Sequence, residues 1–288
     1  MRILAVGIAA LDIINTVDAY PGEDQEVRAS QQRLSRGGNA TNTLVVLSQL
    51  GQKCDWAGVL ADDPDSSYLV ADLNRYNIDL GCCEAYPGGK TPTSYVSLSA
   101  ATGSRTIVHY RDLPEYSAAA FEKVALEDYD WVHFEGRNVP DLALMLQRAK
   151  ANGVACSLEI EKPRAGIEEL FGLPDVLLFS RAYAVEKGYD QPADFLRSVQ
   201  PLISRGGKVF LAWGEEGGAA LDADGRFCSS PAFAPGQVVD TLGAGDVFNA
   251  GVIHALLCGS PVEQALEAAC RLAGKKCGQE GLDGLDHE

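Results

Sequence analysis

The stretch Val239-Asp240-Thr241-Leu242-Gly243-Ala244-Gly245-Asp246-Val247-Phe248-Asn249-Ala250 decides how the rest of the sequence is interpreted. Two glycines flank Ala244, Asp246 follows at once, and apolar residues then recur at helical spacing as far as Gly259-Ser260-Pro261. The glycines are therefore expected at a helix N-terminus, where the first backbone N–H groups have no partner inside the helix. Together with the helix dipole, these free donors favour a bound phosphate or a developing anion.

The acid that follows the glycines suggests chemistry. A carboxylate beside an anion hole can take the proton of a hydroxyl that is about to attack phosphorus, which is the role we expect for Asp246. A capped helix after a plain glycine turn is the simpler interpretation of Gly-x-Gly-Asp alone. The stretch is not a dinucleotide fingerprint, because Phe248 stands at the third glycine position, and no Lys-Ser or Lys-Thr follows as in a Walker P-loop.

A second glycine turn, Arg36-Gly37-Gly38-Asn39-Ala40-Thr41-Asn42, opens another predicted helix. Asn39 and Asn42 are three residues apart and share a helix face, and two amides on one face suit the hydroxyls of a sugar. Asn39 taken alone is equally typical of a helix N-cap. Asp12 is an isolated acid after the first apolar run, where open α/β sheets bind ligands. Its alternative is a solvated carboxylate on an edge strand.

The rest of the sequence predicts an α/β fold with a central, mostly parallel sheet flanked by helices. Strands are expected at 131–135, 154–160, 176–180 and 208–213, alternating with helices at 141–151 and 193–204. After Asp246 a helix is expected to reach Cys258, and a final helix runs from about Val262 to Cys277. The glycine-rich, acidic tail from Gly278 is expected to fray.

A small antiparallel sheet is expected to project from this core as a lid. Residues 93–99 and 104–110 alternate polar and apolar side chains around a turn, which is typical of a hairpin. With residues 13–18 and 25–35 they would form a sheet within a single domain spanning 1–288, its lid inserted from about 13–35 and 92–111. The apolar face of such a lid predicts a homodimer.

The amino-acid composition restricts the classes of molecule that the protein is expected to bind. The net charge of −16 argues against nucleic acid or an anionic membrane surface, because both require a basic face. The eight cysteines contain no Cys-x-x-Cys pair and there are only four histidines, so no zinc spacing is evident. Free thiols and the absence of an apolar run long enough to span a membrane predict a cytoplasmic protein.

The two glycine motifs together resemble the signatures of the ribokinase-like (phosphofructokinase B type) carbohydrate kinases. Further stretches narrow the resemblance to the ketohexokinase (fructokinase) branch of that family. They are Leu11-Asp12 with Val17-Asp18-Ala19-Tyr20-Pro21, Gly103-Ser104-Arg105-Thr106-Ile107, Glu135-Gly136-Arg137-Asn138, Glu161-Lys162-Pro163-Arg164, Ala212-Trp213-Gly214-Glu215-Glu216-Gly217 and Ala273-Gly274-Lys275-Lys276-Cys277-Gly278.

The resemblance implies ATP-dependent phosphorylation of the 1-hydroxyl of D-fructose, giving fructose 1-phosphate and ADP. It implies that Asp246 is the catalytic base and that the anion hole consists of Gly243, Ala244 and Gly245, which also contact the nucleotide. The implied sugar-binding residues are Asp12, Gly38, Asn39, Asn42 and Asp246. The implied nucleotide-binding residues, besides the anion hole, are Arg105, Gly214, Glu215, Glu216 and Gly217.

The ions are not assigned to residues. Many ribokinase-like enzymes carry an Asn-x-x-Glu motif associated with magnesium and phosphate, whereas the corresponding strand end here reads Ser180-Arg181-Ala182-Tyr183. Mg²⁺ is therefore expected as the counter-ion of ATP without named protein ligands. K⁺ is a further candidate ion, also without named protein ligands.

Two alternatives stay open at this point. The first is a ribokinase-like kinase for another ketose, a nucleoside or a sugar phosphate. A sugar phosphate needs cations near Asp12 and Asn39, and Arg28, Arg33 and Arg36 could supply them, so charge does not decide the question. The second is a non-catalytic sugar or nucleotide sensor, which would have no need of a base at position 246.

Overall fold

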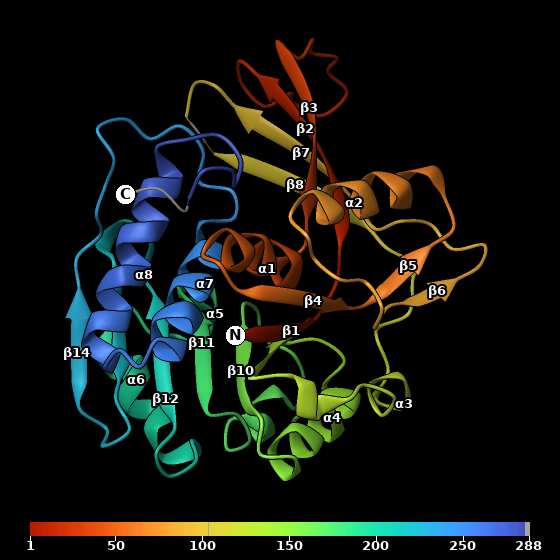
Figure 1. Ribbon diagram of the computed structural model, residues 1–288. Coiled ribbons are helices and arrows are strands. Elements are labelled where there is room, and N and C mark those ends of the chain that lie inside the picture. Colours follow the sequence, from red (N-terminus) through yellow and green to blue (C-terminus); the bar gives the residue numbers. More distant parts are fainter. Residues whose placement is uncertain (103, 286–288) are drawn as a thin grey trace.

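The computed structural model describes residues 1–102 and 104–285. It contains a large sheet of eight strands in the order β14-β13-β12-β11-β10-β9-β1-β4 (Figure 1). Their bounds, in the same order, are Phe227–Ser230, Gly218–Leu221, Lys208–Ala212, Val176–Ser180, Ala155–Ile160, Trp131–Glu135, Arg2–Val6 and Lys53–Ala57. All neighbours from β4 to β12 are parallel, and β13 and β14 continue the sheet antiparallel. The predicted fold class is confirmed.

Eight α-helices in the described ranges cover both faces of this sheet. They are α1 (Asn39–Gln49), α2 (Pro64–Arg75), α3 (Ala118–Phe121), α4 (Val139–Ala151), α5 (Arg181–Glu186), α6 (Pro192–Val199), α7 (Ala244–Leu257) and α8 (Val262–Cys277). Two separate apolar cores result, because strand side chains alternate between the faces. One core packs the sheet against α3 to α6, and the other packs it against α1, α2, α7 and α8.

The lid is a separate sheet of four strands in the order β3-β2-β7-β8, projecting at the top of Figure 1. The strands are β3 (Gln31–Gly37), β2 (Ala10–Val17), β7 (Thr93–Ser99) and β8 (Arg105–Tyr110), and a further pair, β5 (Val59–Ala61) and β6 (Glu84–Tyr86), lies beside the core. The expected hairpin is formed by β7 and β8; residue 103, which belongs to its predicted turn, lies outside the described residues.

Two details of the predicted lid are wrong. The sheet is not antiparallel throughout, because β2 and β7 pair in parallel from Leu11↔Thr93 to Val17↔Ser99. Both strands leave the core at the same level and run outward together, so they share a direction. The polar ribbon is also shorter than expected, since residues 25–30 form no strand and β3 begins at Gln31.

The structure also differs from, or agrees with, the predictions for two helices and for the C-terminal tail. The helix expected at 193–204 ends at Val199 and continues as a 3₁₀ turn, Gln200–Leu202, because Pro201 has no N–H to donate. The final helix has the predicted bounds. The prediction of a frayed tail is wrong for residues 278–285, because Leu285 is buried and the Leu282 carbonyl accepts a hydrogen bond from Gln49 Nε2 (2.8 Å). Residues 286–288 lie outside the described part.

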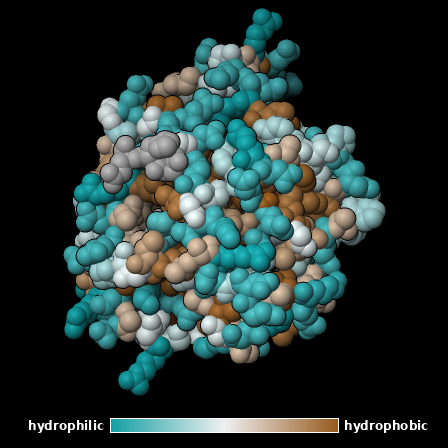
Figure 2. All heavy atoms as spheres, viewed as in Figure 1, coloured by the Kyte–Doolittle hydropathy of each residue, from teal (hydrophilic) through white to brown (hydrophobic). Residues whose placement is uncertain are grey.

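The surface in Figure 2 is hydrophilic over most of the face seen, with apolar residues in small patches between polar ones. Among the described residues, no helix combines the length and the apolar character needed to cross a bilayer.

Candidate active site

The first glycine turn forms the N-terminus of α7, as its spacing predicts. Gly243 is the N-cap, with a φ of 78° that favours glycine, and Asp246 lies in the first turn of the helix. Among the described residues no side chain caps this end, and the Ala244 N–H donates to the Thr241 carbonyl oxygen (3.3 Å). The helix start therefore presents backbone N–H donors, with the positive end of the helix dipole, of the kind that an anion requires.

This turn lies between two cavities of opposite character. Leu242 and Gly243 line a polar cavity of about 280 Å³, which is bounded by the lid, α1, α2 and the C-terminal segment. Thr241, Ala244 and Gly245 line a mostly apolar cavity of about 480 Å³ beside α8. A group bound at the turn can therefore be approached from two sides by two different molecules.

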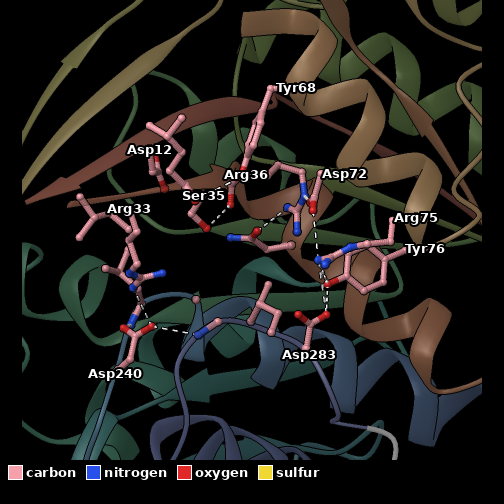
Figure 3. A pocket seen from close by; sticks show the side chains of 17 residues that line it. Asp12, Arg33, Ser35, Arg36, Tyr68, Asp72, Arg75, Tyr76, Asp240 and Asp283 are labelled. Atoms are coloured by element: carbon pink, nitrogen blue, oxygen red, sulfur yellow. Dashed lines mark hydrogen bonds and ion pairs between the residues drawn. The ribbon is translucent and has the colours of Figure 1, made fainter. Parts of the chain in front are cut away.

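The polar cavity brings together side chains from distant parts of the chain (Figure 3). Asp12 comes from β2 and Asn42 from α1, and Asn42 Nδ2 donates a hydrogen bond to Asp246 Oδ2 (2.7 Å). Burial raises the pKa of Asp12, although a hydrogen bond from Ser94 opposes the shift. Asn42 thus connects the cavity wall to the carboxylate that follows the glycine turn.

Asp246 has the electrostatic surroundings of a proton acceptor that works near neutral pH. Burial raises its pKa well above the ordinary range, Asn42 opposes this, and the charges of Glu161 and Glu135 add to the rise. A base whose pKa lies close to the working pH transfers protons most effectively. Such a perturbed carboxylate at an anion-binding turn marks a candidate functional group.

The second glycine turn positions α1. Gly38 is the N-cap of α1 with a φ of 106°, and an added Cβ would lie 2.1 Å from the Ile8 carbonyl oxygen. Asn39 is therefore the first helical residue rather than the cap. Its Nδ2 donates to Glu159 Oε1 (3.1 Å) and Glu161 Oε2 (3.2 Å). Gly38 and Asn39 do not line the polar cavity, whereas Asp12 and Asn42 do.

The apolar cavity contains most of the expected nucleotide-binding residues. Gly214, Glu215 and Gly217 line it, and Arg105 reaches it from β8, where its Nη1 donates to Thr241 Oγ1 (3.2 Å). The remaining wall consists mainly of small and aromatic residues, which suits a flat heterocyclic base: Ala212, Ala232, Phe233, Ala234, Pro235, Val238, Phe248, Cys270, Ala273, Gly274 and Cys277.

Glu216 departs from the expectation. It does not line the apolar cavity, and its carboxylate is 3.2 Å from Arg181 Nη2 on the side of a neighbouring surface hollow. The Gly214–Glu216 turn is a 3₁₀ helix, in which successive side chains point in different directions. We therefore leave Glu216 out of the proposed nucleotide site.

Sequence reasoning missed a group of buried acids beside Asp246. Glu135 and Glu159 lie opposite each other on β9 and β10, and burial raises the pKa of both. Glu159 Oε1 accepts hydrogen bonds from Asn39 and Asn249, while its Oε2 is buried without a partner among the described residues. The signal available in the sequence was an acid inside or at the end of an apolar strand, which is unusual for a structural position.

Metal-binding side chains are not clustered in residues 1–102 and 104–285. In the described part of the chain, no three His, Cys, Asp or Glu side chains are grouped so as to hold one. Mg²⁺ binds comfortably with one or two carboxylates, substrate phosphates and water. The carboxylates near the turn would therefore suit a magnesium ion that arrives with a nucleotide.

Comparison with known proteins gives the class to which this fold and site belong. The model of the pfkB family of carbohydrate kinases matches residues 1–287. The chain belongs to this family and is an ATP-dependent carbohydrate kinase.

Among individual proteins, ketohexokinase of Mus musculus is 43% identical over 293 residues, covering 99% of this chain and 98% of the mouse protein. Two solved structures share the fold. A putative ribokinase from Agrobacterium tumefaciens superposes with a TM-score of 0.87 at 22% identity, covering 97% of this chain and 92% of that protein. Arabidopsis thaliana ribokinase complexed with ribose and ATP gives a TM-score of 0.80 at 20% identity, covering 97% and 93%.

Proposed function

We propose that this kinase transfers the γ-phosphoryl group of ATP to the 1-hydroxyl of D-fructose, giving fructose 1-phosphate and ADP. The observation that carries the proposal is the glycine turn between a polar and an apolar cavity, with Asp246 beside it. The 43% identity to mouse ketohexokinase supports fructose as the acceptor.

The mechanism rests on positioning and charge stabilisation. The sugar hydroxyl is held near Asp246, whose carboxylate takes its proton as the new O–P bond forms. The bond between the γ-phosphorus and the bridging oxygen breaks, and ADP leaves. The amides of Gly243, Ala244 and Gly245 stabilise the negative charge on the transferring group. Asn42 keeps the Asp246 carboxylate in place through its 2.7 Å hydrogen bond.

The charges of the polar cavity favour an uncharged sugar over a sugar phosphate. Of its arginines, Arg33 pairs with Asp240 and Glu280, and Arg36 pairs with Asp72. The cavity wall carries three arginines, Arg33, Arg36 and Arg75, against four aspartates, Asp12, Asp72, Asp240 and Asp283. A phosphate would have to displace existing ion pairs, whereas hydroxyls can share donors and acceptors with them.

Mg²⁺ is proposed as the counter-ion that neutralises the ATP phosphates, held by them and by water. K⁺ is the second ion to test, without assigned ligands. The location that we propose is the reducing cytoplasm, supported by the eight cysteines, all of which are free in the described structure.

The lid is proposed to cover the bound sugar and to mediate a homodimer. Leu34, Ile13, Tyr95 and Val108 stand in one row across its four strands. Leu34, Tyr95 and Val108 are 49%, 50% and 66% exposed, which is unusual for adjacent apolar residues on a small sheet. A second copy covering this row would bury it and would hold the lid over the site, limiting ATP hydrolysis by water.

The test is ADP release against a panel of sugars with Mg-ATP, with the position of the new phosphate determined by phosphorus NMR. Phosphate on carbon 1 of fructose, with little turnover of fructose 6-phosphate or ribose, is the expected result. Turnover confined to another sugar would retain Asp246 as the base but overturn fructose as the substrate. Turnover of fructose 6-phosphate equal to that of fructose would overturn the argument from paired arginines.

A further inference from the structure

Lys276 is a buried cation that the proposed chemistry does not use. It lies in the last turn of α8, and its side chain has no solvent exposure. Its Nζ donates to the carbonyl oxygens of Asp240 (2.8 Å) and Gln279 (3.3 Å) and is 3.2 Å from Asp240 Oδ2. Lysine is almost never fully buried unless it is paired, because removing an ammonium ion from water is costly.

The partner of Lys276 leads directly to the anion-binding turn. Asp240 stands three residues before Gly243, and its Oδ1 accepts the backbone N–H of Leu242 (2.9 Å). Its Oδ2 also pairs with Arg33 of the lid strand β3 (3.2 Å). In addition, the Val239 N–H donates to the carbonyl of Cys277, the residue after Lys276 (2.8 Å). The conformation of the chain before the turn is therefore set by the end of α8.

We propose that Lys276 is a positioning residue for phosphoryl transfer. Its ammonium fixes the carbonyl and the carboxylate of Asp240, so that the amides of Gly243 to Gly245 remain aimed at the transferring phosphoryl group. The inference rests on the function proposed above for that turn. Anion-hole donors act through preorganisation, so an error in their direction lowers the rate even when both substrates still bind.

A purely structural ion pair would have different consequences. Losing it would lower the free energy of unfolding. The measured activity would then fall only because a smaller fraction of the enzyme is folded. A positioning role predicts a lower kcat at nearly unchanged sugar affinity in the folded fraction. It also predicts that a separate small ammonium ion can restore the rate, provided that the substitution leaves room for it.

Two substitutions of Lys276 test the proposal: one leaves the space of the deleted side chain empty, and the other fills most of it. Lys276→Ala removes three methylenes and the ammonium, and the deleted atoms correspond to n-propylammonium. Lys276→Met removes the charge but fills most of the space. Both variants are expected to lose kcat by at least ~10², as for a lost anion-hole donor, with the fructose Kd from calorimetry within about threefold of wild type. Added n-propylammonium should restore Lys276→Ala several-fold and leave Lys276→Met unchanged.

The controls separate the possible explanations. Choline at the same ionic strength is too large for the space and should restore neither variant. Wild-type kcat in Lys276→Met, or equal restoration of both variants, would overturn the inference. If neither variant folds by circular dichroism, Lys276→Gln keeps an N–H donor of similar reach: a lower kcat at wild-type Kd supports the inference, and wild-type kcat overturns it. Wild-type enzyme that phosphorylates no sugar would instead overturn the proposed function.

Discussion

At the residue scale, Asp246 combines a hydrogen bond to Asn42 with a position directly after the glycine turn that we propose as the anion hole. Asp246→Asn keeps the shape of the side chain but cannot accept the proton. We expect this variant to bind fructose normally and to lose kcat by at least ~10². Calorimetric sugar binding and steady-state ADP release measure the two quantities. Near-wild-type kcat would remove Asp246 from the role of base.

The raised pKa of Asp246 also predicts the pH dependence of the reaction. The carboxylate must be ionised to accept a proton, so kcat/KM should fall as the pH drops through the pKa of the folded enzyme. Because burial raises this pKa, the fall should occur at higher pH than for an exposed aspartate. The negative charge of Glu161 contributes to the rise, so Glu161→Gln should move the acid limb to lower pH. A shift to higher pH in that variant would contradict the assignment.

Much of this site could be predicted from local sequence. A glycine turn followed by an acid at the start of a helix can be recognised from a few neighbouring residues. The positions of Gly243 and Asp246 were therefore predictable. The partners of these residues were not. Glu159 and Lys276 reach the site from other elements, and nothing near them in the chain indicates that Glu159 contacts the Asn39 amide or that Lys276 contacts the Asp240 carbonyl. Contacts across more than thirty residues depend on tertiary packing rather than on a local motif.

At the element scale, the orientation of α1 depends on Gly38. An added Cβ would approach the Ile8 carbonyl oxygen to 2.1 Å and would also be strained by the φ of 106°. Gly51 is a matched control, because its φ of 82° is similar and no atom of the described residues lies within 4 Å of an added Cβ. We expect Gly51→Ala to cost about 1 kcal/mol of unfolding free energy from the backbone alone. Gly38→Ala should cost a further ~1–3 kcal/mol from overpacking.

Urea denaturation of both variants measures the difference. Gly38→Ala should also lower kcat, since a shifted α1 carries Asn42 away from Asp246, whereas Gly51→Ala should leave kcat unchanged. Equal losses of stability in the two variants would show that the contact with Ile8 has no energetic role.

Some helices and strands could be predicted from the sequence more fully than others. The strands from β9 to β12 were predictable because apolar runs alternate with helical patterns, which implies a parallel sheet. The pairing of β2 with β7 was not, because the two strands are about eighty residues apart and either direction is compatible with their side-chain pattern. The C-terminal segment was misjudged for a related reason: its glycines suggest mobility, yet Leu285 is buried against the core.

At the scale of the whole molecule, the exposed apolar row on the lid predicts assembly. A charge in the middle of a buried interface is costly, so Val108→Asp should convert the proposed dimer into a monomer. Val185→Asp introduces the same change at a 53% exposed valine on α5, outside the lid, and should leave the dimer intact. Analytical ultracentrifugation measures both. A wild-type monomer, or a dimer that survives Val108→Asp, would exclude the lid row as the interface.

The hydrogen bond between Asn42 and Asp246 joins residues that are 204 positions apart, and residues 281–283 complete the wall of the polar cavity. This separation has a consequence for biosynthesis. The ribosome delivers α1 well before α7, and a nascent chain folds as its segments emerge. Until α7 and the segment after α8 have left the exit tunnel, the emerging chain lacks Asp246, the proposed base, and the polar cavity lacks part of its wall. A growing polypeptide of this kind is therefore expected to consume no ATP until these segments have joined α1.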